Sequence, residues 1–207
     1  MVEAQDGAKE GCIVVLGATG GIGSVLARRL AAKGNRLLIA GRNPEKLEAL
    51  AAEIGAVALV LDARRAAEVQ AGLDKAVERF GRVDGVANCV GSLLLKPAHL
   101  TSQDEFDDTV ATNLGSAFAT VHAAGRVMRQ GGSIVLVSSA AARLGLPNHE
   151  AIAAAKAGII GLALSAAATY ASRGLRVNCV APGQSWVTGQ ILGVDGGLGS
   201  VRARGGG

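Results

Sequence analysis

The sequence predicts a single α/β domain with a doubly wound (Rossmann-type) sheet of seven parallel strands and helices on both faces. Two observations lead to this fold class. Short continuous apolar runs alternate with long helical stretches, which is typical of a parallel sheet covered by crossover helices. The length of 207 residues suits one domain, and a hydrophobic content of 49% allows it to bury a core. We therefore expect residues 1–207 to form one domain.

The expected strands and helices follow in chain order. The strand candidates are the short apolar runs 13–16, 36–40, 57–61, 85–88, 133–137, 176–180 and 190–194. The helix candidates are the longer segments 21–33, 44–54, 65–80, 103–128 and 149–172. Asn43 and Pro44 predict a cap and a first helical residue, Gly55 a left-handed helix end, and Ser102 with Glu105 a capping box.

Segment 151–171 is apolar nearly all the way round and rich in Ala, Gly and Ser. Such a helix requires burial on two sides. One side can lie on the sheet, so we expect the other to pack against a second subunit.

Composition limits the partners. The net charge of +4 is spread along the chain, and only three Phe, one Trp and one Tyr could stack on bases, so we expect no nucleic-acid partner. Each of the three cysteines falls in or beside an expected strand, where a free cysteine can pack as a small apolar side chain in a reducing compartment. We expect no metal site. Residues 1–11 lack the apolar core of a signal peptide, and no uninterrupted apolar run approaches about 18 residues. We therefore expect a cytoplasmic protein without a membrane partner.

A glycine-rich turn joins the first expected strand to the first expected helix. Residues 17–23 read GATGGIG, in which Gly17 permits a tight turn, Gly21 lets the backbone approach a pyrophosphate, and Gly23 allows close helix packing. The helix N-terminus adds N–H donors and a dipole that favours an anion. The turn predicts a dinucleotide site, and the alternative is a tight turn without a ligand.

The glycine spacing resembles that of the short-chain dehydrogenase/reductase family, and further motifs extend the resemblance over nearly the whole chain. Residues 88–91 (NCVG) are similar to the family's NNAG element, and 176–178 with 181–183 to its RVN…PG segment. Asn113, Ser139 and Lys156 match its helix asparagine, its catalytic serine and the lysine of YxxxK.

The resemblance implies an oxidoreductase that transfers a hydride between a nicotinamide dinucleotide and a small carbonyl or alcohol substrate, as a homodimer or homotetramer formed through the helices containing Asn113 and Lys156. The implied catalytic residues are Ser139, Lys156 and Asn113. The implied cofactor-binding residues are Gly17, Thr19, Gly21, Ile22, Gly23, Arg42, Asp62, Asn88, Gly91, Lys156, Pro182 and Gly183.

The end of the second strand bears on the choice of cofactor. A carboxylate there would bind a ribose hydroxyl, whereas Arg42 matches the geometry of a 2′-phosphate, which favours NADP(H) over NAD(H). The alternative is a solvated arginine. Asp62 resembles the family's adenine-contacting aspartate, or caps the following helix.

Ile152 stands where the family has its catalytic tyrosine, four residues before Lys156. The resemblance assigns that tyrosine the proton transfer, and the lysine lowers its pKa and holds the ribose. General acid–base catalysis contributes about 10²–10⁴-fold, so the chain is either an enzyme with an atypical or impaired acid or a non-catalytic NADP(H)-binding subunit or sensor.

Three sources of the proton can be weighed. Tyr170 lies fourteen residues beyond Lys156, about 21 Å along a helix, and cannot reach the site. His149 lies seven residues before Lys156 on the same helix face, and a histidine ordinarily titrates near neutral pH. The alternative is that His149 is a solvent-exposed residue at the start of the helix without a catalytic role. Ser139, or a water held by Asn113 and Lys156, is the third source.

The connection after Pro182 is short. Parallel neighbours need a crossover of about a dozen residues, yet only eight, 181–188, precede Gly189 and the strand 190–194. Family members carry a long substrate segment at this place, whereas this chain passes from Gly183 to Trp186 almost at once. Either the last strand is placed differently, or a segment that forms part of the substrate pocket is missing there.

Overall fold

The structure is a computed structural model and describes residues 12–182. Its strands are β1 (Cys12–Leu16), β2 (Arg36–Gly41), β3 (Val57–Val60), β4 (Gly85–Asn88), β5 (Gly132–Val137) and β6 (Leu175–Val180). Its longer helices are α1 (Gly21–Ala31), α2 (Pro44–Ile54), α3 (Ala66–Phe80), α4 (Gln103–Val110), α5 (Ser116–Val127) and α6 (Glu150–Tyr170).

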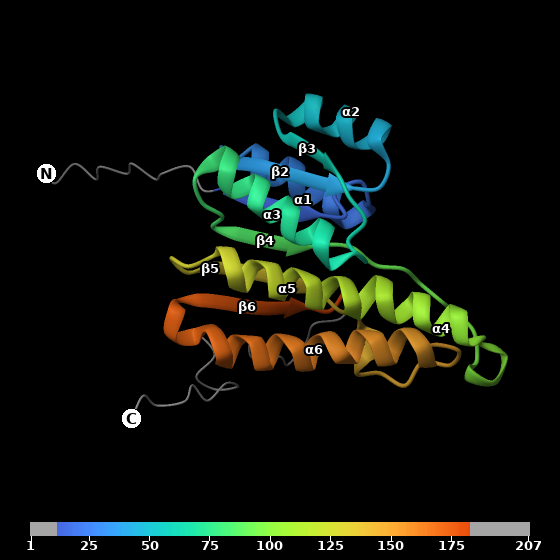
Figure 1. Cartoon of the computed structure of the whole chain (residues 1–207). Coiled ribbons are helices and arrows are strands. Elements are labelled where there is room, and N and C mark those ends of the chain that lie inside the picture. The colour runs from blue at the N-terminus through green and yellow to red at the C-terminus, as the bar shows by residue number, and fades with distance from the viewer. Residues whose placement is uncertain (1–11, 183–207) are drawn as a thin grey trace, which may run out of the picture.

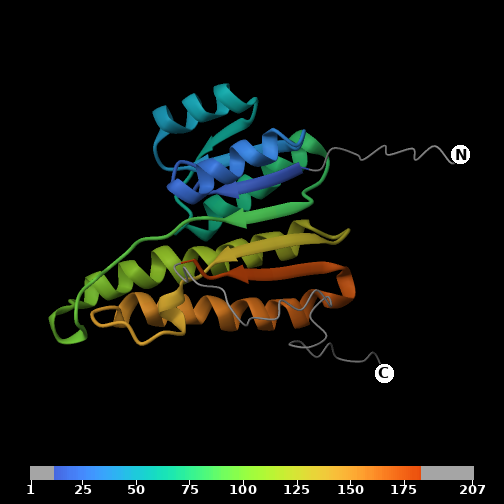
Figure 2. The same ribbon diagram turned by 180° about the vertical axis from the view of Figure 1, so that it is seen from behind.

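The six strands form one parallel sheet in the order β3-β2-β1-β4-β5-β6. Helices α1 and α2 cover one face, and α3, α5 and α6 cover the other (Figures 1 and 2). The predicted α/β class and the doubly wound parallel sheet are thereby confirmed for the described residues, with six strands in place of seven. The seventh expected strand, 190–194, and the short connection after Pro182 lie outside the described residues.

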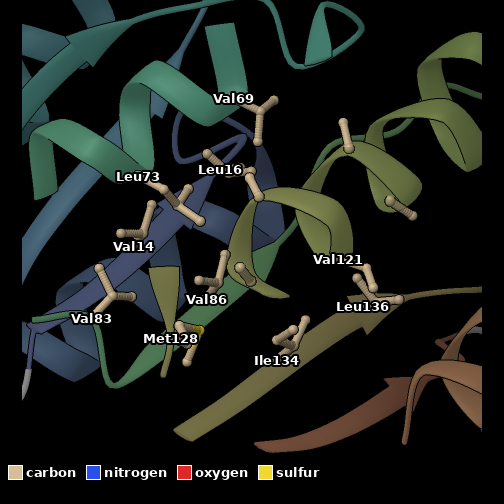
Figure 3. Packing of buried hydrophobic residues seen from close by; sticks show 14 of the residues in the cluster. Val14, Leu16, Val69, Leu73, Val83, Val86, Val121, Met128, Ile134 and Leu136 are labelled. Carbon is tan, nitrogen blue, oxygen red and sulfur yellow. The ribbon is translucent and has the colours of Figure 1, made fainter. Parts of the chain in front are cut away.

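The side chains of β1 alternate between two hydrophobic clusters, one on each face of the sheet. Val14 and Leu16 belong to the cluster that includes Leu73 of α3, whereas Val15 belongs to the cluster that includes Leu47 of α2. Figure 3 shows Val14, Leu16 and Leu73 in the first cluster. A strand covered on both faces must be apolar at successive positions. This is why continuous apolar runs predicted the strands.

The predicted helix boundaries are confirmed where local chemistry specified them. Asn43 Oδ1 accepts a hydrogen bond from Lys46 N at 2.8 Å and caps α2. Gly55 ends that helix in the left-handed region, with φ 68°. At the start of α4, Glu105 N donates to Ser102 Oγ at 3.2 Å while Ser102 N donates to Glu105 Oε2 at 2.8 Å. This reciprocal pair is the predicted capping box.

The predicted helix 103–128 is confirmed as a continuous helical segment over residues 103–127, but a π-helical turn, Ala111–Gly115, interrupts its α-helical ladder between α4 and α5. A π-turn widens the helix and frees a carbonyl from the regular ladder. Ser116 Oγ donates to Thr112 O at 2.7 Å and lies 3.2 Å from Asn113 O, so the widened turn is satisfied by a hydroxyl. Asn113 therefore sits at a local distortion of the helix.

Helix α6 is apolar on nearly all sides, as predicted, and packs against β6, α4 and α5. Its outward positions include the exposed residues Ala157, Gly161 and Leu164. By length and composition, the segment Glu150–Arg173 is also apolar enough to cross a membrane, contrary to the expectation that no segment would be. The core helix of a soluble protein meets the same criterion.

Candidate active site

A cleft of about 250 Å³ opens beyond the carboxyl ends of β1 to β4. In doubly wound sheets, ligands bind at such a crevice where the strand order reverses, here between β1 and β4. The lining residues come from the loops that follow these strands and from the π-turn: Gly17, Thr19, Gly20, Gly41, Arg42, Asn43, Leu61, Asp62, Ala63, Arg64, Cys89, Val90, Gly91 and Thr112. The cleft thus contains five of the predicted cofactor residues, Gly17, Thr19, Arg42, Asp62 and Gly91.

The glycines of the first loop have different surroundings. Gly17 has φ +73°, and a Cβ there would lie 2.8 Å from the backbone of Cys89 and Val90. A Cβ at Gly23 would overlap the carbonyl oxygen of Gly17. At Gly21, nothing lies within 4 Å of that position. Gly17 and Gly23 therefore shape the fold, while Gly21 leaves open space that a ligand can occupy.

The start of α1 suits an anion. Within residues 12–182, no side chain caps its N–H groups, and its first turn has no acidic residue. Gly21 and Ile22 are exposed there. Free N–H groups and the helix dipole favour a negatively charged ligand at such an end. The loop and the helix start together fit the pyrophosphate of a dinucleotide.

Charged side chains gather at the far end of the cleft. Arg42 is exposed directly after β2, and Asp62 lies in the loop after β3, which ends at Val60 and thus earlier than predicted. Arg64 Nη2 lies 2.6 Å from Asp62 Oδ2, and Arg64 Nη1 lies 3.0 Å from Asp108 Oδ1 of α4. Arg64 thereby joins the wall formed by the loop after β3 to α4.

The Arg64 guanidinium holds the pKa of the Asp62 carboxyl below its ordinary value of 3.8, mainly through their side-chain hydrogen bonds. Arg42 adds a smaller Coulombic contribution in the same direction. Asp62 therefore stays ionised and paired. It does not cap α3, because that helix begins after Arg65, without a side-chain cap.

Lys156 is buried in α6, with 7% of its surface exposed. Its Nζ donates to the carbonyl oxygen of Val137 at 2.9 Å. Burial lowers the pKa of the Lys156 ammonium. Ser138 Oγ donates to Lys156 O at 2.8 Å, so the end of β5 fixes both the backbone and the side chain of this lysine.

Asn113 and Lys156 approach the same point from different helices. A Cβ at Gly91 would lie 3.0 Å from Asn113 Oδ1 and 3.3 Å from Lys156 Nζ. Asn113 Nδ2 donates to Ser92 Oγ at 3.0 Å and to Thr109 O at 2.9 Å, while Ser92 N donates to Asn113 Oδ1 at 3.2 Å. The amide is thus held rigidly beside the lysine.

Ser139 lies at the carboxyl end of β5, half-buried, and its Oγ accepts a hydrogen bond from Ala141 N at 3.2 Å. The next residue connects it to another predicted site residue, because Ala140 N donates to Pro182 O at 2.9 Å. Gly183 lies outside the described residues. A backbone hydrogen bond therefore joins the segments that follow β5 and β6 on the predicted substrate side of the site.

Ile152 is buried, with 2% of its surface exposed, one helical turn before Lys156. His149 Nδ1 donates to Pro147 O at 2.7 Å, because a carbonyl oxygen only accepts. His149 is not among the cleft-lining residues. Tyr170 packs against Gly125 near the end of α5, where a Cβ on that glycine would lie 2.7 Å from Tyr170 Oη. The structure thus keeps Tyr170 away from Lys156, as the helix length predicts.

Asn88 is buried beneath the site instead of lining the cleft. Its Nδ2 donates to Ser116 Oγ at 3.2 Å and to Thr120 Oγ1 at 3.1 Å. Its Oδ1 accepts from Val90 N at 2.9 Å. Asn88 therefore ties the loop after β4 to α5 and positions the cleft wall.

Cys12, Cys89 and Cys179 are free; Cys12 is buried, whereas Cys89 and Cys179 are half-buried and Cys89 lines the cleft. Burial raises the pKa of Cys12 and of Cys89 to about 11, so both thiols stay protonated at neutral pH. No group of three or more metal-ligating side chains lies within residues 12–182.

Sequence reasoning missed three residues that organise the site: Arg64, Ser92 and Ser138. Arg64 follows Asp62 by two residues, a spacing that could have indicated their ion pair. Its second partner, Asp108, comes from a distant helix and leaves no signal in the sequence. Ser92 and Ser138 act through contacts with Asn113 and Lys156 that only the fold reveals.

The sheet, the glycine turn and the uncapped start of α1 define an α/β domain of the dinucleotide-binding class. The family model for enoyl-(acyl carrier protein) reductase matches residues 17–185. The chain therefore belongs to the short-chain dehydrogenase/reductase family of oxidoreductases.

Relatives of known sequence and structure agree with this assignment. The chain is 38% identical to D-threitol dehydrogenase of Mycolicibacterium smegmatis over 82% of this chain and 68% of that protein. It is 34% identical to levodione reductase of Leifsonia aquatica over 84% and 69%. A putative dehydrogenase from Burkholderia cenocepacia with bound NADP has a similar fold, with TM-score 0.80, 28% identity and coverage of 83% and 68%.

Proposed function

We propose that this chain binds NADP(H) and transfers a hydride to or from a carbonyl or alcohol substrate at a slow rate. One observation carries the proposal. The cleft is lined by Gly20, directly before the uncapped start of α1, and by Gly91, next to which Lys156 Nζ and Asn113 Oδ1 lie. The bound cofactor would supply the hydride. The names of the relatives, a threitol dehydrogenase and a levodione reductase, support an alcohol or carbonyl substrate.

The chain's own residues would position the reactants. The N–H groups of α1 hold the pyrophosphate, and Lys156, fixed by Val137, directs its remaining N–H donors toward the nicotinamide ribose. Ser139 binds the substrate oxygen, and Asn113 orders a water beside Lys156. Each role uses a hydrogen-bond donor that the fold holds in place, which reduces the free-energy cost of orienting the substrate and the cofactor.

Ile152 removes the hydroxyl that would deliver the proton. The loss of a general acid raises the barrier by roughly 3 to 5.5 kcal/mol. The proton then comes from Ser139, from the water beside Asn113 and Lys156, or from His149. Asn113 Oδ1 and Lys156 Nζ both lie next to Gly91 of the cleft lining, which supports a water held there as the source, whereas Ser139 and His149 both lie outside the lining.

Two guanidiniums support NADP(H) over NAD(H). Arg42 and Arg64 both line the far end of the cleft. Because Arg64 pairs with Asp62, that carboxylate repels a 2′-phosphate less than an unpaired carboxylate would. The NADP bound to the Burkholderia cenocepacia relative supports the same choice.

The second candidate is a non-catalytic NADP(H)-binding subunit or sensor, which the buried hydrocarbon of Ile152 favours. Turnover on a carbonyl panel separates the two functions. NADPH oxidation is measured for the natural chain, Ile152→Tyr, Ile152→Phe and His149→Ala.

We expect slow turnover by the natural chain, no loss in His149→Ala, and a gain of about 10²–10⁴-fold in Ile152→Tyr. Ile152→Phe, which adds a ring without the hydroxyl, should show no gain. If the natural chain binds NADPH but has no turnover, and only Ile152→Tyr is active, the binding-subunit function holds instead. Loss of natural turnover in His149→Ala would identify the histidine as the acid.

We also propose that the chain assembles through α5 and α6. Phe118 of α5 is 60% exposed and Leu164 of α6 is 46% exposed, next to the small residues Ala157 and Gly161. Exposed aromatic and aliphatic side chains over small residues favour a closely packed helix interface. A cytoplasmic location stays a prediction.

A further inference from the structure

A second groove, of about 460 Å³, lies away from the candidate active site. Its lining residues are Gly125, Arg126, Arg129 and Arg173. They directly precede β5 and β6, so the groove lies near the amino ends of these strands, whereas the cleft lies beyond the carboxyl ends of β1 to β4. Figure 1 shows the last turns of α5 and α6 at this end of the molecule, far from α4. We call this feature the arginine groove.

The three guanidiniums of the arginine groove have no carboxylate partner in the described part of the chain. Among residues 12–182, no ion pair joins Arg126, Arg129 or Arg173 to an acidic side chain. The cause is local, because Glu150 is the only acidic residue between positions 109 and 182. Glu150 begins α6, about 30 Å along the helix from its last residue, Tyr170. The groove is therefore a concentration of unpaired positive charge.

Helix ends account for part of this charge. Arg126 lies in the last turn of α5, Arg129 Nε donates to Arg126 O at 3.4 Å, and Arg173 Nη2 donates to Met128 O at 3.2 Å. Arginines commonly offset the carbonyl groups at a helix C-terminus in this way. Each helix end carries only about half of an elementary negative charge, so two ends leave an excess of about two positive charges in the groove.

Arg173 is held in place before a ligand binds. Its guanidinium carbon lies 5.3 Å from the centroid of the Tyr170 ring, and its Nη2 contacts Met128 O. Tyr170 in turn packs on Gly125, where a Cβ would lie 2.7 Å from Tyr170 Oη. A guanidinium that is already fixed loses less conformational entropy on binding, and Arg173 keeps further N–H donors for a ligand.

The charge of the arginine groove suits a phosphate group. A phosphate monoester carries a charge of about −1.5 to −2 at neutral pH, which balances the excess that the helix ends leave. Guanidiniums bind phosphate oxygens through pairs of N–H groups, and three such oxygens can engage all three arginines. A carboxylate has one charge and two oxygens, and so satisfies fewer of these donors.

We propose that the arginine groove binds the phosphate group of a small anion, either inorganic phosphate or a phosphate monoester, at a site separate from the dinucleotide cleft. The proposal goes beyond the proposed oxidoreductase function and does not depend on it. Helix α5 follows the π-turn of Asn113, and α6 carries Lys156, so the ligand contacts the far ends of both helices that hold these site residues.

Calorimetric titration of the full chain with inorganic phosphate, phenyl phosphate and acetate, at about pH 8, tests the proposal. The groove variants are Arg126→Gln and Arg129→Gln. Arg176→Gln is the control of equal charge, because Arg176 is an exposed arginine of β6 between Leu175 and Val177, whose side chains belong to the cluster on the opposite face. Arg42→Ala reports on the dinucleotide cleft, and thermal unfolding confirms that each variant is folded.

We expect phosphate or phenyl phosphate to bind at least about tenfold more tightly than acetate, and the tighter of the two identifies the source of the phosphate group. Each groove variant should weaken this binding by at least about fivefold, whereas Arg176→Gln and Arg42→Ala should retain it.

Three results would overturn the phosphate site. The first is a natural chain that binds neither phosphate probe, or binds acetate equally well. The second is an equal loss of affinity in Arg176→Gln, which would mean that net charge alone attracts the anion. The third is a loss confined to Arg42→Ala, which would place the phosphate in the dinucleotide cleft.

Discussion

At the scale of single residues, the candidate active site retains the residues that position Lys156 but lacks the hydroxyl group that would donate the proton. Lys156 is buried, oriented by Val137, and shares its helix face with Ile152. Ile152 thus preserves the packing of α6 while removing the proton donor, which separates cofactor binding from chemistry.

Two glycines of this region, Gly17 and Gly21, allow a role in the fold to be distinguished from a role in cofactor binding. Gly17→Ala should destabilise the fold by at least about 2 kcal/mol, because it places a side chain at φ +73° against the backbone of Cys89. Gly21→Ala should leave the free energy of unfolding nearly unchanged, since its Cβ meets open space, but should weaken NADPH binding by crowding the pyrophosphate.

Chemical denaturation and NADPH titration of both variants check this pair. A Gly21→Ala protein with full NADPH affinity would contradict the placement of the pyrophosphate at α1.

At the scale of elements, the salt bridges of Arg64 connect the loop after β3 to α4. The folded-state pKa of Asp62 is lowered below 3.8, so its stabilising contribution is complete above that pH and is lost as the pH falls through the lowered value. Thermal unfolding of the natural chain and Asp62→Asn should therefore differ at pH 6, and the difference should shrink as the pH falls from 3.8 through the lowered value.

Asp74→Asn is the matched control, because Asp74 is an exposed carboxylate of α3 with no ion pair among the described residues. An Asp62→Asn difference that persists unchanged at low pH would mean that the ion pair contributes nothing.

Elements with a local cause were predictable, and elements with a distant cause were not. The cap at Asn43 and the box at Ser102 use residues three positions apart, so the sequence contains the whole interaction. In the π-turn at Asn113, the Ser116 hydroxyl donates a hydrogen bond to a backbone carbonyl and the Asn113 amide donates to Ser92 of a distant loop. The helical periodicity of the sequence cannot reveal these contacts. Gly17, Lys156 and Asn113 could be predicted because each belongs to a motif with a fixed spacing in the sequence. The contact between Arg64 and Asp108 could not be predicted, because it joins two distant segments.

At the scale of the whole molecule, α5 and α6 carry the exposed apolar side chains Phe118 and Leu164. Helix α1, which covers the opposite face of the sheet, carries Val25, an apolar side chain that is 51% exposed. If a second copy covers α5 and α6, Phe118→Glu should lower the molar mass in light scattering from oligomer to monomer, because an unpaired charge is costly in an apolar interface.

Val25→Glu on α1 should leave the mass unchanged. A natural chain that is already monomeric at high protein concentration would contradict assembly through α5 and α6.

The central claim is that the crevice at the start of α1 binds a phosphorylated dinucleotide, and titration of NADPH and NADH into the natural chain and Arg42→Ala tests it most directly. We predict that NADPH binds at least about tenfold more tightly than NADH and that Arg42→Ala removes most of this preference, because a guanidinium gains a charge-assisted contact with the 2′-phosphate. Equal affinity for both dinucleotides would contradict the assigned role of Arg42, and binding of neither would contradict the claim itself.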